Sequence, residues 1–454
     1  MDTAEPSRRG PAVSVPLRAA DVNLRHSTGA GAMNDQGKGT ATVATATSVP
    51  KMPPFVLKLL ERFLPIRTDV LAAAGAVAWF VAFGFCFLWS HSGFLDLQIY
   101  MAAGHNVLLG RVPYDVGYTS AHLDATYPPF GLLIVSPLSL LDTTTIDLLW
   151  FGANVASLVA IVSLALRDVT TWDRRRRLAA AAVLAGLATL FIEPVRSDFN
   201  FGQINILLMA LVVLDVCARR NPTRGVLIGL AGAVKFTPLI FVLLFLLKRD
   251  WRSALRAVLT FLALTAGAFA VMPSASARYF THFSEETSHI GSPLFRSNQS
   301  WSGILHRAHL FPHGTLTLVA FLLDVVTVAG ATFLAHRLLR GPSVIPPLFV
   351  LALAGLLCSP ISWTHHWSWV VLAPVVAASA IVPRGIRVGL GVIVLVAVAY
   401  PYWWLQLGPL TQLAEDTLAL SAIVLLAGWV VIEWRSTRTT STVASGGGTQ
   451  TTLG

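Results

Sequence analysis

The residues best suited to chemistry in this sequence stand beside long apolar runs. Asp96 follows the first such run and is flanked by Phe94, Leu95 and Leu97. An apolar setting raises the pKa of a carboxyl group towards the range of a general base, so Asp96 is a candidate catalytic base. The alternative is that Asp96 caps a helix running through 99–109.

Two cationic or hydrogen-bonding groups have a comparable setting. Lys235 and Pro238 interrupt the apolar stretch 224–247. A lysine at such a depth requires an anion or water as its partner, so Lys235 is a candidate ligand for a phosphate, with an internal salt bridge as the alternative. His365 and His366 are adjacent and point in different directions. Either could contact a phosphate, or both could be incidental members of an interfacial aromatic belt.

Other polar and aromatic residues could bind a substrate. The candidates for substrate binding are Tyr100, Tyr127, Arg196, Asp198, Gln203, Asn298 and Trp363, and Arg296 is a further candidate for the phosphate. Asp115 and Asp124 could join Asp96 on a cation, but their spacing matches no metal signature, so we predict neither a metal nor a cofactor.

The composition requires that these residues be positioned by a membrane-embedded scaffold. Hydrophobic residues make up 54% of the chain, charged residues only 12%, and the mean hydropathy is +0.66, whereas about a quarter of a soluble chain is charged. The chain carries neither a nucleotide-binding motif nor the Asp-x-Asp pattern of nucleotide-sugar enzymes. The three cysteines lie in apolar runs and form no disulfide or zinc pattern.

Apolar runs and basic clusters together predict the topology. Runs long enough to span a membrane occur near 69–90, 143–167, 178–194, 202–218, 253–272, 316–339, 343–360, 363–382, 385–403 and 414–434. We expect 128–141 to dip into the membrane, and 224–247 to enter, break near Lys235 and return. Every basic cluster then lies on the cytoplasmic side, so the net charge of +10 reflects topology and not nucleic-acid binding.

The predicted architecture is an all-α polytopic membrane protein of about twelve helices, namely ten full spans and one broken pair. Both termini are expected in the cytoplasm. We expect a disordered cytoplasmic extension over 1–62, the membrane domain over 63–435 and a disordered cytoplasmic tail over 436–454. Nearly all of the unusual polar residues then gather on the external face. A site at that depth suits the head group of a lipid-linked substrate.

Several segments, in order, resemble a known family. They are FLDLQIY (94–100), GRVPYD (110–115), ATYPPFGLLIVSPL (125–138), FGQINILL (201–208), GLAGAVKFTPLIF (229–241), NQSWSG (298–303) and SPISWTHHWSWVVLAP (359–374). Together they resemble the actinobacterial polyprenyl-phosphate-mannose-dependent glycosyltransferases of family eighty-seven, within the GT-C class. The resemblance covers roughly residues 66–405.

The resemblance implies a plasma-membrane mannosyltransferase whose active site faces the periplasm, with an interfacial helical first loop. It implies transfer of mannose from polyprenyl-phosphate mannose, with inversion, to a phosphatidylinositol mannoside, lipomannan or lipoarabinomannan, forming an α-(1→2) linkage. Asp96 would be the base, and Lys235, His365, His366 and Arg296 would supply positive charge to the phosphate.

Other functions remain open at this point. The family also contains arabinofuranosyltransferases that use decaprenyl-phosphate arabinose. A carrier or flippase for a lipid-linked sugar would share the helices and an outward cavity, but its substrate must pass through, and the spans at 69–90, 316–335 and 385–399 are almost wholly apolar. A non-catalytic partner in polysaccharide assembly is the third alternative.

Overall fold

The computed structural model describes residues 66–89, 93–114, 116–119, 122–218, 222–282 and 292–445, and within these ranges every regular element is helical. The chain divides into two units, Met1–Val49 and Pro50–Gly454, and all described residues belong to the second. The predicted extension over 1–62 therefore lies outside the described residues.

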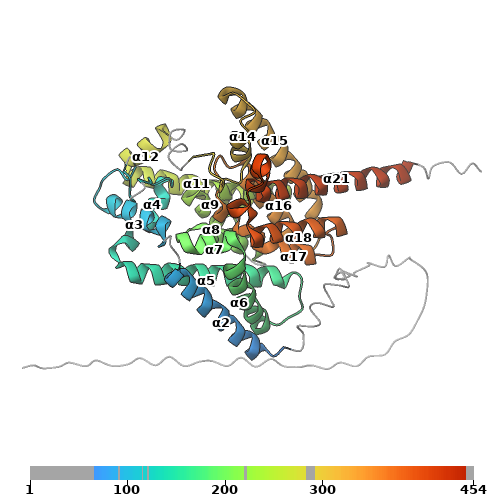
Figure 1. Cartoon of the computed structure of the whole chain (residues 1–454), viewed down its shortest axis with the longest axis horizontal. Coiled ribbons are helices and arrows are strands. Elements are labelled where there is room, and N and C mark those ends of the chain that lie inside the picture. Colours follow the sequence, from blue (N-terminus) through green and yellow to red (C-terminus); the bar gives the residue numbers. More distant parts are fainter. Residues whose placement is uncertain are drawn as a thin grey trace, which may run out of the picture. The chain divides into compact units, whose positions relative to one another are not determined.

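Twenty-four helical elements follow one another in the described residues (Figure 1). The first are α2 (Thr68–Gly84), η1 (Phe85–Trp89), α3 (Leu95–Leu108), α4 (Pro129–Val135), η2 (Ser136–Leu140), α5 (Thr143–Arg167), α6 (Arg174–Phe191), α7 (Glu193–Phe201), α8 (Asn205–Cys217), α9 (Val226–Val234), η3 (Thr237–Phe241), α10 (Val242–Leu247) and α11 (Trp251–Val271). The others are α12 (Pro273–Thr281), α14 (Trp301–Ala308), α15 (His313–Leu338), α16 (Ile345–Cys358), η4 (Thr364–Leu372), α17 (Ala373–Ala378), α18 (Arg384–Ala399), α19 (Pro401–Trp404), η5 (Gly408–Leu410), α20 (Thr411–Glu415) and α21 (Thr417–Ser445).

The protein is a helical membrane protein. Six helices among the described residues are long and apolar enough to cross a membrane: Thr68–Phe87, Thr143–Arg167, Trp251–Val271, Gly314–Leu338, Arg384–Trp404 and Thr417–Ser436. They coincide with six of the ten predicted spans. The last helix, α21, continues to Ser445 and so includes the beginning of the predicted tail, whereas 446–454 lie outside the described residues.

The other four predicted spans are shorter or broken. The helices α6 and α7 are bent by 84° relative to each other, and Pro194 stands in the first turn of α7, where a proline cannot continue the preceding helix. The helices α8 and α16 have 13 and 14 residues, and the stretch 363–382 divides into η4 and α17. Length alone therefore does not reproduce the predicted count of ten full spans.

The break expected near Lys235 is present. Helix α9 ends at Val234, Lys235 is extended, and η3 begins at Thr237. A Cβ atom on Gly225, at the start of α9, would lie 2.1 Å from the carbonyl oxygen of Ser253 in α11. The start of α9 therefore lies beside the start of α11, and α10 ends only a few residues before α11 begins. The two outer ends of the broken pair, formed by α9 and by η3 with α10, thus lie together, and Lys235 lies at the turn between them.

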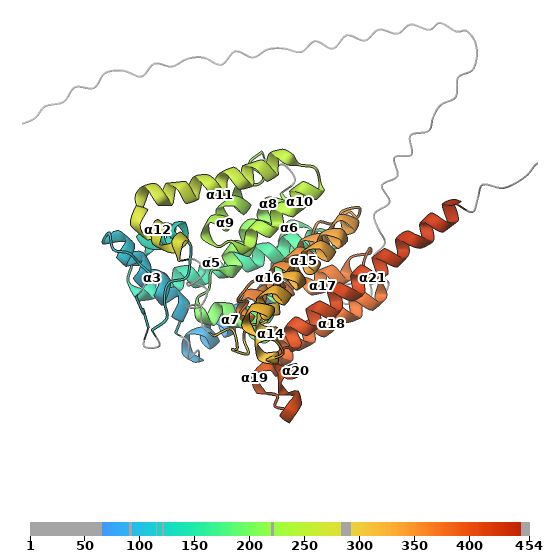
Figure 2. The ribbon, with the colours of Figure 1, turned by 90° about the horizontal axis from the view of Figure 1, so that it is seen from above.

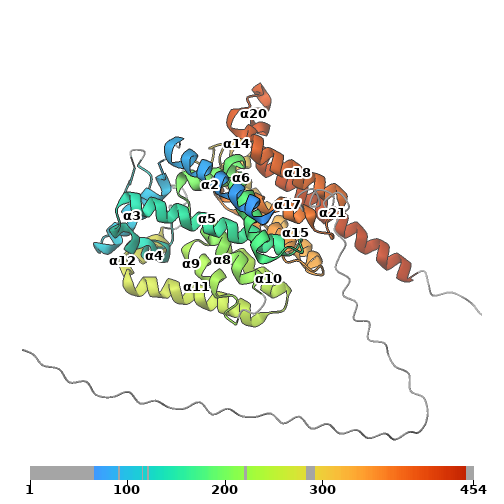
Figure 3. The ribbon, with the colours of Figure 1, turned by 90° about the horizontal axis from the view of Figure 1, so that it is seen from below.

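Two groups of side chains form the core. The main group includes α16, whose residues are nearly all buried beside α15, η3 and η4; a helix that is apolar on all sides is typically buried in this way. A smaller group joins α3, α4 and α12, which lie together in Figure 1 and Figure 3; Figure 2 also shows α3 beside α12. Helix α3 contributes to both groups.

Glycine allows the start of α3 to approach the end of α7. Gly202 follows α7 with a φ of +66°, and a Cβ atom there would lie 2.7 Å from Cβ of Leu97 and 3.2 Å from Cβ of Phe94. Phe94 itself is left-handed, with a φ of 54°, and its N–H donates to the carbonyl oxygen of Asn200 at 3.2 Å. These contacts place Asp96 beside the residue that follows Gly202.

The Gly202→Ala substitution is therefore expected to destabilise the protein by about 1–3 kcal/mol, because the added methyl group overpacks this contact and the backbone is strained. Thermal unfolding of the detergent-purified protein measures the effect. Gly152→Ala is the matched control, since a Cβ atom on Gly152 in α5 would meet nothing within 4 Å. Equal unfolding temperatures for the two variants would refute the role given to Gly202.

Candidate active site

A cavity of about 570 Å³ gathers most of the predicted site residues. The eight that line it are Asp96, Tyr100, Tyr127, Gln203, Lys235, Trp363, His365 and His366. They come from α3, from the segment before α4, from the α7–α8 connection, from the turn of the broken pair and from η4. The folding of distant segments around one cavity therefore unites residues that the sequence analysis selected separately.

Asp96 lies in the first turn of α3 but does not cap it. The N-cap residue is Phe94, and the cap has no side-chain hydrogen bond, so the capping alternative for Asp96 is wrong. The carboxylate instead accepts a 2.5 Å hydrogen bond at Oδ2 from Nε2 of Gln203. Burial raises the pKa of Asp96 to about 6, although the Gln203 hydrogen bond and the charge of Lys235 oppose the rise.

Gln203 is held so that its N–H group faces Asp96. Its Oε1 atom lies 3.0 Å from the hydroxyl of Tyr100, 3.2 Å from the hydroxyl of Tyr127 and 3.2 Å from Nδ2 of Asn205. All three groups can donate a proton, so the oxygen of the amide must face them. The predicted substrate-binding residues Tyr100, Tyr127 and Gln203 thus also orient Asp96.

Asn205 connects the carboxylates to Lys235 and was not selected from the sequence. Its Nδ2 donates to Oδ2 of Asp198 at 3.0 Å, and its Oδ1 accepts from Nζ of Lys235 at 2.9 Å. The sequence signal was available, because Asn205 is an uncharged polar residue two positions after Gln203 at the start of an apolar helix. Asp198 is fully buried behind it and also accepts from the Ser368 hydroxyl at 3.3 Å.

Lys235 contacts neutral groups. Besides Asn205, its Nζ lies 3.1 Å from Nε2 of His366, and 5.5 Å from the ring centre of Tyr127. An ammonium group has donors only, so Nε2 of His366 accepts, and the proton of that ring is on Nδ1. Among the described residues, Lys235 therefore forms no internal salt bridge, because its close partners are an amide and an imidazole.

The two histidines differ in their partners. The ring of His365 lies 4.8 Å from that of His366 and 5.4 Å from that of Phe201, measured between centroids. His365 is buried, and within the described part of the chain its Nε2 has no hydrogen-bond partner. A buried nitrogen at the wall of a cavity without a partner is suited to contact a ligand.

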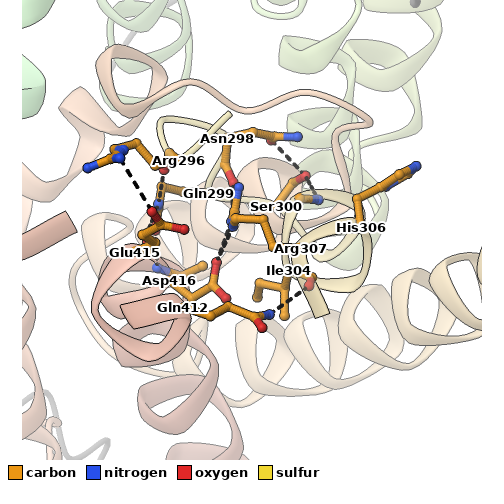
Figure 4. Close-up of polar contacts among 12 residues, drawn as sticks. Arg296, Asn298, Gln299, Ser300, Ile304, His306, Arg307, Gln412, Glu415 and Asp416 are labelled. Carbon is orange, nitrogen blue, oxygen red and sulfur yellow. Dashed lines mark hydrogen bonds and ion pairs between the residues drawn. The ribbon is translucent and has the colours of Figure 1, made fainter. Parts of the chain in front are cut away.

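Besides Asp198, three predicted residues do not line the cavity. Arg196 lies 5.0 Å over the ring of Tyr400 and donates to the carbonyl oxygen of Leu190 at 3.2 Å. Arg296 pairs with Glu415 at 3.6 Å (Figure 4). The third is Asn298, which is described next.

Asn298 is fully buried and holds a loop together. Its Oδ1 accepts from the Ser300 hydroxyl and from the N–H of Ser362, both at 2.9 Å, and its Nδ2 donates to the carbonyl oxygen of Pro293 at 3.2 Å. Both acceptor positions of Oδ1 are occupied, and the side chain does not line the cavity. The sequence prediction that Asn298 binds substrate is replaced by a structural role.

The possible cation site receives no support from the described residues. Asp124 lines the cavity with Asp96, whereas Asp115 lies outside the described residues. Among the residues that the structure describes, no three histidine, cysteine, aspartate or glutamate side chains are grouped so as to hold a metal ion.

Comparisons with known proteins find relatives that match most of the chain. The model of Glycosyltransferase family 87 matches residues 125–360, just over half of the chain. A polyprenol-phosphate-mannose-dependent alpha-(1-2)-phosphatidylinositol mannoside mannosyltransferase of Mycobacterium tuberculosis is 33% identical over 67% of this chain and 73% of the relative. The protein of the same description from Mycolicibacterium smegmatis is 36% identical over 63% of this chain and 69% of the relative.

The name of a third relative refers to a larger glycolipid. It is a polyprenol-phosphate-mannose-dependent alpha-(1-2)-phosphatidylinositol pentamannoside mannosyltransferase of Mycolicibacterium smegmatis, 30% identical over 72% of this chain and 77% of the relative. No solved structure matches the chain. Asp96 precedes the segment that the family model matches.

We expect Gln203→Leu to raise the pKa of Asp96 above its value of about 6, because losing the N–H donor destabilises only the carboxylate form. Infrared difference spectra measure the pH midpoint of the C=O stretch of the protonated carboxyl group. Asp96→Asn identifies the band by removing it. An unchanged midpoint in Gln203→Leu would mean that this hydrogen bond does not control Asp96.

Proposed function

Because the chain belongs to glycosyltransferase family 87, we propose that it is an integral-membrane hexosyltransferase that transfers mannose from polyprenol-phosphate mannose to a phosphatidylinositol mannoside, forming an α-(1→2) linkage. The names of the relatives support the donor, the acceptor class and the linkage. The observation that carries the proposal is the shared cavity. A carboxylate suited to act as a base reaches it, and so does a lysine whose hydrogen-bond partners among the described residues are an amide and an imidazole.

Asp96 is the general base of this reaction. Its carboxylate removes the proton of the acceptor hydroxyl as that oxygen bonds to the anomeric carbon of mannose. The bond from the anomeric carbon to the phosphate oxygen breaks with its electron pair going to the phosphate, and the configuration inverts. A pKa of about 6 keeps most of Asp96 ionised at neutral pH while making it more basic than an ordinary aspartate.

Lys235 compensates the negative charge that develops on the leaving phosphate. Its position supports this role, since Asn205 and His366 orient the ammonium group without neutralising it. Of the two histidines, we assign the second phosphate contact to His365, because Nε2 of His366 already accepts from Lys235 whereas Nε2 of His365 has no partner among the described residues.

The topology that serves this reaction places the cavity on the periplasmic side of the plasma membrane and both termini in the cytoplasm. About twelve helices form the membrane domain, with α3 at the interface. The short helices α8 and α16 cross the membrane inside the protein, where other helices surround them. They can therefore be shorter than the about 20 apolar residues that a lipid-exposed span requires. The basic clusters of 174–177 and 384–387 support this orientation.

The first measurement is transfer of radiolabelled mannose from polyprenol-phosphate mannose to a phosphatidylinositol mannoside by the purified protein in nanodiscs. We expect a longer glycolipid from the wild type and a loss of about 10²–10⁴-fold in kcat for Asp96→Asn, because the amide cannot accept the proton. Asp124→Asn, in the same cavity, is the control and should retain turnover. Near wild-type rates for Asp96→Asn would remove Asp96 as the base.

The pH profile is a second readout of the same assignment. Asp96 acts only when ionised, so kcat/KM should fall about tenfold per pH unit below about pH 6. If the wild-type protein transfers mannose neither to phosphatidylinositol mannoside nor to lipomannan acceptors, the result would favour the carrier function.

Lys235→Ala is expected to raise KM for the lipid donor about 10- to 100-fold, because the phosphate loses a hydrogen bond and the positive charge of the ammonium group beside it. KM for the acceptor should change little. Initial rates at varied donor and acceptor concentrations separate the two constants. Lys235→Arg keeps the charge and is expected to lose less; a Lys235→Ala variant with unchanged donor KM would exclude the phosphate contact.

A further inference from the structure

Three of the aromatic side chains that line the cavity form one group of ring contacts and have no role in the reaction described above. Phe295, Trp363 and Trp403 come from separate segments, and the ring centroid of Phe295 lies 6.0 Å from that of Trp363 and 5.7 Å from that of Trp403. Phe295 is 49% exposed and Trp403 is 36% exposed. We refer to these three residues as the aromatic wall. Such exposure of large rings at a cavity is a feature of binding surfaces.

A buried carboxylate fixes the indole of Trp403. Glu193, at the start of α7, accepts from Nε1 of Trp403 at 3.3 Å, from the hydroxyl of Tyr402 at 2.6 Å and from the hydroxyl of Thr364 at 3.2 Å. All three donors are neutral, and burying a carboxylate with neutral partners alone is costly. The arrangement fixes both the position and the plane of the Trp403 ring.

Two arginines hold the loop that carries Phe295. Arg307 forms a buried ion pair with Asp416 and donates to the carbonyl oxygen of Phe295 at 2.8 Å. Arg296 donates to the carbonyl oxygen of Trp403 at 3.3 Å. Both exposed rings are therefore held in place before any ligand binds, which lowers the entropic cost of binding.

We infer that the aromatic wall is a stacking subsite for a sugar ring of the acceptor glycan. The C–H groups on one face of a pyranose carry partial positive charge and match the negative face of an aromatic ring. The inference rests on the proposed function. The donor has one sugar, attached to the phosphate at Lys235, whereas the acceptor presents sugars beyond the one whose hydroxyl meets Asp96. Those sugars extend along the cavity to the exposed rings.

Leucine variants of two residues of the aromatic wall test the subsite. Trp403→Leu and Phe295→Leu remove a ring face but keep apolar volume, and each should raise KM for the glycolipid acceptor about 3- to 10-fold. Donor KM and the acid limb set by Asp96 should not change, and Trp403→Phe should recover part of the loss. Trp404→Leu is the matched control, because Trp404 is 59% exposed and does not line the cavity.

Glu193→Gln tests the positioning role of the carboxylate. It keeps the volume of the side chain, and its amide can still accept at one oxygen, but it cannot accept from all three donors. We expect the acceptor KM to rise as in Trp403→Leu, with donor KM unchanged. A change in donor KM of the same size would show a general structural effect and overturn the positioning role.

A direct binding measurement separates the subsite from the transferase function. Saturation-transfer difference NMR with methyl α-mannoside on the nanodisc protein should show saturation of the ring C–H protons in the wild type, Asp96→Asn and Trp404→Leu, and weaker saturation in Trp403→Leu. No saturation in the wild type, or an equal signal in Trp403→Leu, overturns the subsite. A wild type that binds methyl α-mannoside at Trp403 but transfers no mannose would refute the proposed function alone.

Discussion

An ionisable carboxylate beside an ammonium group in a largely apolar cavity is stable only if the remaining polar atoms around both groups are satisfied. Two amide side chains meet this condition: Gln203 holds Asp96, and Asn205 holds Lys235, with the two amides hydrogen-bonded to each other. Each amide has its oxygen and nitrogen fixed by its neighbours. Asp96 and Lys235 are thereby held by two different amides, and the two side chains form no ion pair with each other.

The backbone is irregular where these side chains are needed. Lys235 is extended at the turn of a broken helix pair, α7 is bent sharply away from α6, and the two histidines lie on a 3₁₀ segment. Within a membrane such backbone is tolerated only where protein surrounds it or where it borders a cavity. The regular, lipid-facing length of helices such as α11 and α15 supports this irregular interior, and the functional residues are concentrated in the interior.

Composition and apolar length were sufficient to predict a helical membrane protein, six helices long enough to span a membrane and the break at Lys235, because apolar length and proline act locally. Single positions of unusual chemistry, such as Asp96 and Lys235, were also apparent. The roles of Asn205, Trp403 and Glu193 were not, since each depends on contacts between segments far apart in the chain. For the same reason Asn298, a polar residue in a loop that was predicted to be external, could not be distinguished from a ligand contact until its partners were known.

Helix α3 lies between two cores of unequal size. Phe94, Leu97 and Tyr100 belong to the main core, whereas Ile99 and Ala103 belong to the small core with α4 and α12. Asp96 is therefore anchored to the larger core, while another part of the cavity lining, which includes Tyr279, rests on the small core. Substitutions in the small core would therefore reshape one side of the cavity without moving the main core that holds Asp96.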